Sequence, residues 1–323
     1  MDAGTPQGGV VSPLLANIAL HGMETALGVQ FNATGATISD RAVVRYADDF
    51  VVFCESKEDA EMVVDLLKEW LALRGLALAE EKTRIVHLTE GFDFLGFNVR
   101  HYKDTSAKSG YKLLITPSKE SEKRIKETLR KEWIRLRGTT IQAVLRALNP
   151  IIRGWAHYHR INVASKTFGA LDNWMFHREV RHIKRTHPTK PTSWTRARYF
   201  GPLNPTRRDR WVFGDKRTGG YLLKFAWFKI ERHTLVQGTA SPDDPALREY
   251  WAKRMAAKTK DLPPRKQRIA RAQNHVCPLC GESIHNGEAL HAHHVHGRRT
   301  SDAVILVHLY CHQQVHGTVK NSA

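Results

Sequence analysis

Two adjacent carboxylates, Asp48 and Asp49, separate two apolar runs in the stretch VVRYADDFVVFC, residues 43–54. The β-branched and aromatic residues on either side predict two strands that are buried on both faces and joined by a tight turn. Such a hairpin would hold both carboxylates at a rigid, partly exposed tip, where their oxygens can bind Mg²⁺. Acidic pairs are also common in ordinary polar turns, so the hairpin alone leaves both interpretations open.

Four residues near the other end of the chain have the spacing of a zinc site. Cys277 and Cys280 are three residues apart, and His308 and Cys311 form a second pair with the same spacing. Two such pairs are typical of a tetrahedral, treble-clef-like structural Zn²⁺ site. The remaining cysteine, Cys54, lies in an apolar run, so the grouping favours metal binding over a disulfide framework and over free thiols.

Further histidines lie close to these ligand pairs in the sequence. His293 and His294 are adjacent, and His312 and His316 would share one face of a helix that begins near residue 310. A site with four ligands leaves these histidines without a role, so they need a separate explanation. Three others are expected to be surface histidines: His285, His291 and His296.

The chain is strongly basic. Its 323 residues include 50 Lys and Arg against 32 Asp and Glu, a formal net charge of +18, which indicates a polyanionic partner, most simply nucleic acid. Charge alone does not distinguish RNA from DNA. Because no apolar run approaches the roughly 20 residues of a membrane span and no signal-peptide pattern opens the chain, we expect no membrane partner and a cytoplasmic location.

The elements that must position these residues change character along the chain. Residues 13–27 predict a buried helix, residues 57–74 an amphipathic helix, and residues 83–102 strands with a tight apolar turn at 92–97. This segment is expected to be α+β, with helices on one face of an antiparallel sheet. Three helical runs follow, and the first carries many cations opposite its apolar face: residues 117–137, 141–160 and 170–185.

The last third of the chain is less regular. Residues 186–262 are rich in Pro, Arg and Trp, and the neighbouring cationic and aromatic side chains suit stacking on unpaired bases, although a solvated basic loop is the simpler alternative. Residues 261–264 are expected to be a linker to a compact final unit. The expected fold is multidomain α+β, with bounds at 1–110, 111–185, 186–262 and 263–323.

Four motifs together resemble the group II intron-encoded reverse transcriptase/maturase family. They are GTPQGGVVSPLLANIAL near the start, YADD, GLALAEEKT at 75–83 and FDFLGF at 92–97. The resemblance implies a partial right-hand polymerase palm in which Asp48 and Asp49 are catalytic carboxylates that bind Mg²⁺. It also implies that residues 94–97 support the primer end. The residues implied to contact nucleotide, template or nucleic acid are Pro6, Gln7, Gly8 and Lys82.

The helical region resembles the thumb of the same family, called domain X. Its signature is RGWAHYHR, residues 153–160, and the resemblance implies binding of intron RNA and assistance in splicing. Within it, Trp155 and Tyr158 are expected to anchor the core, whereas Arg153 and Arg160 are the candidates for phosphate contact.

The histidines outside the zinc pairs resemble the ββα-metal arrangement of HNH endonucleases. The resemblance implies that His293, His312 and His316 bind a catalytic divalent ion and that His294 is the general base for cleavage of target DNA. Ala303 stands where that family has an Asn that braces the loop of the base, so nuclease activity is expected to be weakened. A basic run could grip the DNA backbone: Arg265, Lys266, Arg268, Arg271, Arg298 and Arg299.

Three functions remain open. The first is the C-terminal part of a reverse transcriptase/maturase with an HNH nuclease. In that case polymerisation would need a further Asp, from an N-terminal half that precedes this chain or is supplied in trans. The second is a non-catalytic RNA-binding splicing cofactor. The third is a lone DNA-nicking enzyme.

Overall fold

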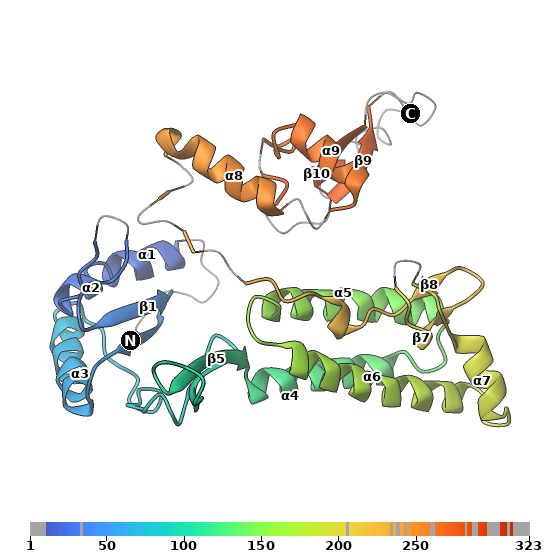
Figure 1. Cartoon of the computed structure of the whole chain (residues 1–323), viewed down its shortest axis with the longest axis horizontal. Helices are drawn as coiled ribbons and strands as arrows, with labels where there is room; N and C mark the ends of the chain where they lie inside the picture. Colours follow the sequence, from blue (N-terminus) through green and yellow to red (C-terminus); the bar gives the residue numbers. More distant parts are fainter. Residues whose placement is uncertain are drawn as a thin grey trace. The chain divides into compact units, whose positions relative to one another are not determined.

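The computed structural model describes residues 11–32, 35–204, 207–232, 235–236, 240–241, 244–258, 262–281, 283–285, 290–295, 304–308 and 311–312. Its contacts divide the chain into two units, one of residues 1–31 and 37–235 and one of residues 32–36 and 236–323 (Figure 1). Among the described helices, none combines the length and the apolar character that crossing a membrane requires.

The YADD stretch forms the predicted hairpin in the first unit. Strands β1 (Ala42–Tyr46) and β2 (Asp49–Phe53) pair in antiparallel register, with Tyr46 opposite Asp49. Helix α3 (Lys57–Ala72) begins at the Ser56 cap, whose hydroxyl accepts from the Asp59 N–H. One face of the hairpin packs on this helix, in a core that includes Val43, Phe50, Val52, Val63, Leu67 and Leu71. The prediction of burial on both faces was wrong, because Val44 is 50% exposed.

The predicted helix at 13–27 is broken into α1 (Ser12–Ala19) and α2 (Met23–Ala26). The break lies at Gly22, whose φ of 85° is a conformation that glycine adopts without strain. Met23 and Leu27 are buried, as expected for this segment. The expectation was wrong for α1, which buries none of its residues. Its exposed apolar side chains are Leu14, Leu15 and Ile18.

The FLGF motif turns between two strands of a separate antiparallel sheet. Strands β3 (Phe92–Phe94), β4 (Phe97–Lys103) and β5 (Tyr111–Pro117) lie in the order β3-β4-β5. Both residues of the turn have positive φ, 49° for Leu95 and 77° for Gly96. Residues 83–91 form no strand, so strand structure starts later than the sequence indicated.

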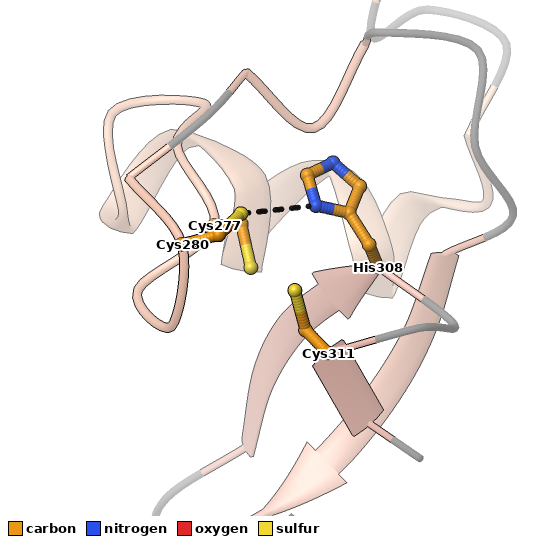
Figure 2. A group of neighbouring side chains, drawn as sticks. All are labelled: Cys277, Cys280, His308 and Cys311. Carbon is orange, nitrogen blue, oxygen red and sulfur yellow. Dashed lines mark hydrogen bonds between the residues drawn. The ribbon is translucent and has the colours of Figure 1, made fainter. Parts of the chain in front are cut away.

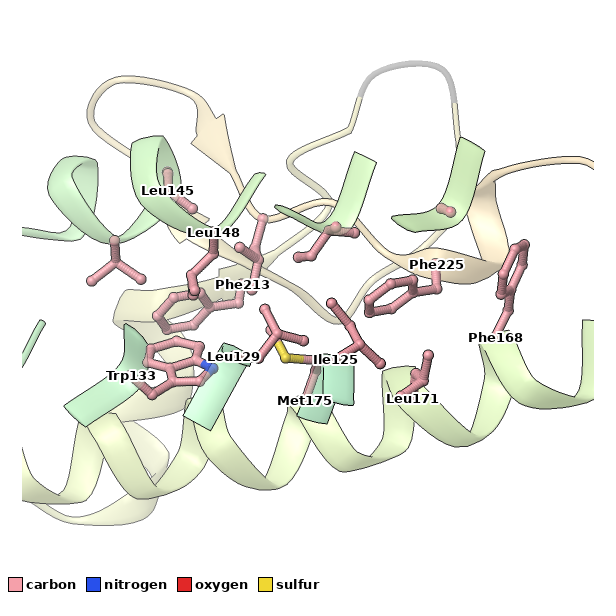
Figure 3. Packing of buried hydrophobic residues seen from close by; sticks show 14 of the residues in the cluster. Ile125, Leu129, Trp133, Leu145, Leu148, Phe168, Leu171, Met175, Phe213 and Phe225 are labelled. Atoms are coloured by element: carbon pink, nitrogen blue, oxygen red, sulfur yellow. The ribbon is translucent and has the colours of Figure 1, made fainter. Parts of the chain in front are cut away.

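Helices α4 (Lys119–Arg135), α5 (Ile141–His159) and α6 (Ser165–Thr186) enclose the largest core of the first unit. This confirms the three predicted helices, although α6 starts five residues earlier than expected. Ser118 and Thr140 cap α4 and α5 by accepting backbone N–H groups three residues on. Figure 3 shows the buried side chains between these elements, among them Ile125, Leu129, Trp133, Leu148, Phe168, Leu171 and Met175.

The same core continues beyond α6. Helix α7 (Thr192–Tyr199), strands β6 (Phe200–Gly201), β7 (Val212–Asp215) and β8 (Gly220–Tyr221), and the 3-10 turn η1 (Phe225–Trp227) follow in order. Phe200, Phe213 and Phe225 are buried against the side chains of α4–α6. The irregular, arginine-rich segment is thus tied to the helices by its aromatic residues.

The second unit has a small core of its own. Its described elements are the 3-10 turn η2 (Pro245–Leu247), helices α8 (Arg248–Lys258) and α9 (Pro264–Ala272), and the antiparallel strands β9 (Leu290–His294) and β10 (Val304–His308). The buried members of this core are Ala270, Cys277, Ile284, Leu306, Val307 and Cys311. Two of the six are cysteines of the predicted zinc site.

Candidate functional site

The two carboxylates of YADD lie at the tip of the β1-β2 hairpin. Ala47 and Asp48 form its two-residue turn, and both Asp48 and Asp49 are exposed. Ala47 has a φ of 54°, which two-residue hairpin turns favour at this position but which is uncommon for a residue other than glycine. Strained backbone of this kind is found preferentially at functional sites.

Two arginines link the hairpin to the neighbouring helices. Arg45 of β1 donates from one nitrogen, Nη1, to the Asn17 side-chain oxygen of α1 and to the Ala47 carbonyl oxygen, each at 3.0 Å. At the other end of β1, Arg41 donates to both carboxylate oxygens of Asp59 on α3 and to the Leu27 carbonyl. No motif in the sequence indicated these contacts, which fix the hairpin relative to α1 and α3.

The FLGF turn contacts the RGWAHYHR helix. The Tyr158 hydroxyl donates to the Leu95 carbonyl oxygen at 2.7 Å. The Phe97 ring stacks on Tyr158 with centroids 5.2 Å apart and meets His159 edge-on at 4.8 Å. The two motifs that the sequence assigned to palm and thumb therefore meet directly, although about 60 residues separate them. Tyr158 is half exposed, so the expected core anchor lies at the margin of the core.

Three hydrogen-bonded side chains, of Ser121, Trp155 and His159, adjoin this contact. Ser121 of α4 accepts a hydrogen bond from the Trp155 indole at 3.2 Å, and its hydroxyl lies 3.0 Å from His159 Nε2. The Trp155 ring also packs on Phe168 and Phe225, which confirms it as a core anchor. Burial lowers the pKa of His159 to about 4, so the ring is neutral at pH 7. Its Nδ1 has no partner among the described residues.

The other predicted contact residues have different surroundings. Lys82 is exposed in a turn, and Arg153 is exposed on α5. Arg160 is mostly buried and forms an ion pair with Glu231. This arginine therefore ties α5 to the segment after η1, in addition to any contact it makes with phosphate.

Cations gather where α4 and α6 run side by side. A shallow groove on α4 is lined by Lys119, Glu122, Lys123, Lys126, Glu127 and Arg130. On α6, burial and the charges of Arg181 and Arg130 lower the pKa of the Arg178 guanidinium. Like charges held this close repel one another in the free protein, and a bound polyanion would relieve that repulsion.

The two predicted zinc-ligand pairs come together in the second unit. One ligand atom from each of Cys277, Cys280, His308 and Cys311 lies within 4.8 Å of every other (Figure 2). Four ligands at tetrahedral Zn²⁺–S distances would stand about 3.8 Å apart. Three sulfurs and one imidazole nitrogen, all within 4.8 Å of one another, are therefore close enough to share one Zn²⁺ ion. In the described part of the chain, no other His, Cys, Asp or Glu side chains form such a group, so no third ligand of this kind accompanies Asp48 and Asp49.

Hydrogen bonds orient the ligands toward a common centre. His308 Nε2 donates to the Ser283 carbonyl oxygen at 3.1 Å, which leaves Nδ1 to face the cysteines, 3.4 Å from Cys280 Sγ. Burial opposes ionisation of Cys277, but backbone N–H groups nearby lower the pKa of its thiol to about 7. Burial and the neighbouring thiols raise the pKa of Cys311 to about 12. A dication would favour the thiolate form of both.

Gln273 holds the strand that delivers His308. Its side-chain amide donates to the Leu306 carbonyl oxygen at 2.8 Å and accepts the Leu306 N–H at 2.9 Å, as a neighbouring strand would. Lys266, predicted to grip DNA, donates instead to the Leu290 carbonyl oxygen at 3.1 Å. Nothing in the sequence singled out Gln273 or Ser283. Gln273 binds the backbone of Leu306 and Ser283 offers its own carbonyl oxygen to His308, and both partners are distant in the sequence.

The remaining histidines are only partly described. His293 of β9 lies beside His312, with ring centroids 5.4 Å apart, and the exposed His291 lies at 5.3 Å from the same ring. His294 follows on the opposite face of the strand, and its buried Nδ1 has no partner among the described residues. His285, predicted to be on the surface, is half-buried and lies against His275. Several residues singled out in the sequence lie outside the described residues: Pro6, Gln7, Gly8, His296, Arg298, Arg299, Ala303 and His316.

Comparison with known protein families matches two regions of the chain. Residues 2–99 match the family described as reverse transcriptase (RNA-dependent DNA polymerase). Residues 122–200 match the family described as the group II intron, maturase-specific domain. The first match contains YADD and FLGF, and the second contains α5 and α6.

Curated proteins from three organisms are similar to parts of the chain. The group II intron-encoded protein LtrA of Lactococcus lactis is 28% identical over a region that covers 30% of this chain and 26% of LtrA. Protein YkfC of Escherichia coli is 29% identical, with 44% of this chain and 40% of YkfC covered. An uncharacterized 91 kDa protein in the cob intron of Schizosaccharomyces pombe is 25% identical, with 48% and 28% covered. The chain thus spans less than half the length of each of these relatives.

Proposed function

We propose that this chain is a group II intron reverse transcriptase/maturase segment that binds intron RNA and assists its splicing. A reverse transcriptase region precedes a maturase region on one chain, and the matches with both families and with LtrA support a role in intron splicing. The observation that carries the proposal is the direct contact between the FLGF turn and the RGWAHYHR helix through Tyr158 and Leu95. We place this function in the cytoplasm.

RNA binding is assigned to the cations on α4 and α6. Arg130 and Arg181 both lie near Arg178, on a surface suited to phosphate. The test is binding of a structured group II intron transcript across a range of salt concentrations. Arg130→Ala and Arg181→Ala should each lower the slope of log K against log salt by about 1. Arg124→Ala is the matched control, because Arg124 on the same helix is paired with Glu120. If all three variants bind like the unmodified chain, the RNA surface is wrongly placed.

Polymerisation is assigned to Asp48 and Asp49 with Mg²⁺, completed by a carboxylate from an N-terminal reverse transcriptase half acting in trans. The support is that no third ligand accompanies this pair in the described part of the chain. Primer extension with Mg²⁺ and all four deoxynucleotides should be absent for the 323-residue chain alone. Extension by the chain alone that Asp48→Ala abolishes would contradict the need for a further half.

Nicking of target DNA is assigned to the second unit, with His294 as general base and His293, His312 and His316 as ligands of a divalent ion. The support is the order of two antiparallel strands followed by helical residues at Cys311 and His312, together with the approach of His312 to His293. Supercoiled DNA should be nicked with Mg²⁺ or Mn²⁺, and His294→Ala should abolish nicking without releasing zinc. His285→Ala is the control, and equal nicking by the His294 variant would reject that assignment.

The second candidate function is a non-catalytic RNA-binding splicing cofactor. The basic surface of α4 and α6 favours it, as does the lack of a third ligand beside Asp48 and Asp49 among the residues that the structure describes. It predicts full RNA binding and splicing assistance, with neither nicking nor primer extension when an N-terminal reverse transcriptase half is added.

A further inference from the structure

A cavity of about 440 Å³ lies where α6 ends and α7 begins. Its volume is within the range of about 300–1,000 Å³ that small-molecule sites occupy. Apolar side chains from α6, from β6 and from the residue before β7 form much of its wall: Phe176, Val180, Ile183, Phe200 and Trp211. Neither the carboxylate tip, the zinc-ligand cluster nor the groove on α4 shares a residue with it.

The rim of this cavity combines an exposed aromatic ring with cations. Trp211 is 49% exposed, and the Arg196 guanidinium carbon lies 5.5 Å from the centre of its ring. Phe200 packs against the same tryptophan with centroids 5.8 Å apart, which fixes the ring at the entrance. A large aromatic side chain held half exposed in this way is available for a flat partner.

A second tryptophan stands next to the cavity. Two cations approach the ring of Trp194: Lys190 Nζ lies 5.6 Å from the ring centroid, and the Arg198 guanidinium carbon lies 5.8 Å from it. Trp194 is 38% exposed, and its ring meets His187 edge-on. Of the residues that line the cavity, Lys184, Lys190 and Arg196 are cationic and none is acidic. The site therefore favours a ligand that is both aromatic and negatively charged.

We propose that this cavity binds one unpaired nucleotide of an RNA strand, with the base against Trp211 and the phosphates toward Lys184, Lys190 and Arg196. The inference rests on the proposed function, since it names which part of an RNA the region after α6 takes. Stacking on an aromatic ring beside cations is how proteins hold single strands without requiring one sequence. A paired base is enclosed by its neighbours in a helix and cannot enter a cavity of this size.

The test measures binding of the whole chain to a 12-nucleotide single-stranded RNA and to a fully paired RNA hairpin of the same composition. Trp211→Ala should weaken binding of the single strand about tenfold, which corresponds to about 1.4 kcal/mol, and change hairpin binding less than twofold. Trp211→Phe keeps an aromatic ring and should restore most of the affinity. With 4-thiouridine in the single strand, photocrosslinking should label the peptide that contains Trp211 or the one that contains Arg196.

The cationic part of the site has its own matched control. Arg196→Ala should weaken binding of the single strand at low salt, whereas Arg74→Ala should not, although Arg74 also lies over a tryptophan ring, that of Trp70. A single-stranded DNA of the same sequence separates the two nucleic acids, because equal sensitivity of DNA binding to Trp211→Ala would overturn the assignment to RNA. Thermal unfolding followed by circular dichroism should show that the variants retain the fold.

Two results would overturn the nucleotide site without rejecting the proposed function. One is an affinity for the single strand that Trp211→Ala and Arg196→Ala leave unchanged, which would leave the proposed RNA-binding function intact. The other is displacement of the RNA by a 12-residue polyglutamate with the same dependence on Trp211, which would indicate an acidic protein segment as the occupant. Failure of the unmodified chain to bind any RNA would reject both the cavity assignment and the proposed function.

Discussion

The phenol of Tyr158 on α5 donates a hydrogen bond to the carbonyl oxygen of Leu95, the first residue of the FLGF turn. Leu95 has a φ of 49°, so this carbonyl belongs to a strained turn that the hydrogen bond helps to hold. The contact joins the β3-β4-β5 sheet to helix α5, whose buried side chains belong to the helical core. Substitutions here should therefore change how firmly the two parts are joined.

Tyr158→Phe removes this hydrogen bond and keeps the ring stacked on Phe97. We expect the free energy of unfolding to fall by about 1 kcal/mol, the usual net contribution of one hydrogen bond. Urea unfolding followed by tryptophan fluorescence measures it. Tyr102→Phe is the control, because Tyr102 is exposed on β4 and its ring faces Arg100. Equal losses in the two variants would show that the phenol of Tyr158 contributes nothing specific.

His159 should make the stability of the first unit depend on pH. Because burial lowers its pKa from 6.5 to about 4, the folded chain holds the neutral ring. The contribution of the neutral ring to the free energy of unfolding is fully present above about pH 6.5 and is lost as the pH falls toward 4. The total loss is limited to about 3 kcal/mol. Unfolding free energies of His159→Gln should vary less between pH 7.5 and 5 than those of the unmodified chain. His21→Gln, at an exposed position, should not change this dependence.

Zinc content should depend on the four clustered ligands. Purified chain should hold one Zn²⁺, and Cys277→Ser or Cys311→Ser should weaken zinc binding at least tenfold, because each removes a thiolate from a closed site. Cys54→Ser is the matched control, since Cys54 lies beside β2 and not in the cluster. Metal analysis after dialysis measures the difference. Full zinc retention by the Cys277 variant would reject the ligand set.

Replacing each of two glycines by alanine should change the stability of the chain in opposite directions. At Gly91, φ is 80° and an added Cβ would stand 2.9 Å from Arg100 Cβ, so Gly91→Ala should destabilise the chain by more than about 1 kcal/mol. At Gly169, inside α6, nothing lies within 4 Å of the added carbon, so Gly169→Ala should stabilise the chain by up to about 1 kcal/mol. Melting temperatures that shift in the same direction would contradict this account.

Local pattern predicted most of the elements of the first unit. The hairpin at YADD, helix α3 and the helices α4–α6 follow from apolar periodicity and caps, which act over a few residues. The sequence could not show that α1 is exposed or that one face of β1 is open, because burial depends on which other segments pack against them. Likewise, Phe200, Phe213 and Phe225 extend the helical core in a segment whose composition indicated only irregular structure.

The candidate sites were predictable to different degrees. Cysteine and histidine spacing identified all four clustered ligands, since a metal site needs donor atoms at defined separations. The residues that orient them, Ser283 and Gln273, contribute or bind backbone groups and carry no sequence signature. The cavity beside Trp211 depends on the meeting of α6, α7 and β6, so composition suggested base stacking there but not which ring would provide it.

The small core of the second unit has a consequence for how that part folds. Cys277 and Cys311 are two of its six buried members, and the segments that carry them lie on either side of β9. Bound zinc acts as a cross-link that closes a long loop, which reduces the conformational entropy of the unfolded chain. The supply of zinc would then set how much of this part is folded at any time, while the helical core of the first unit, which contains none of the four ligands, would fold without it.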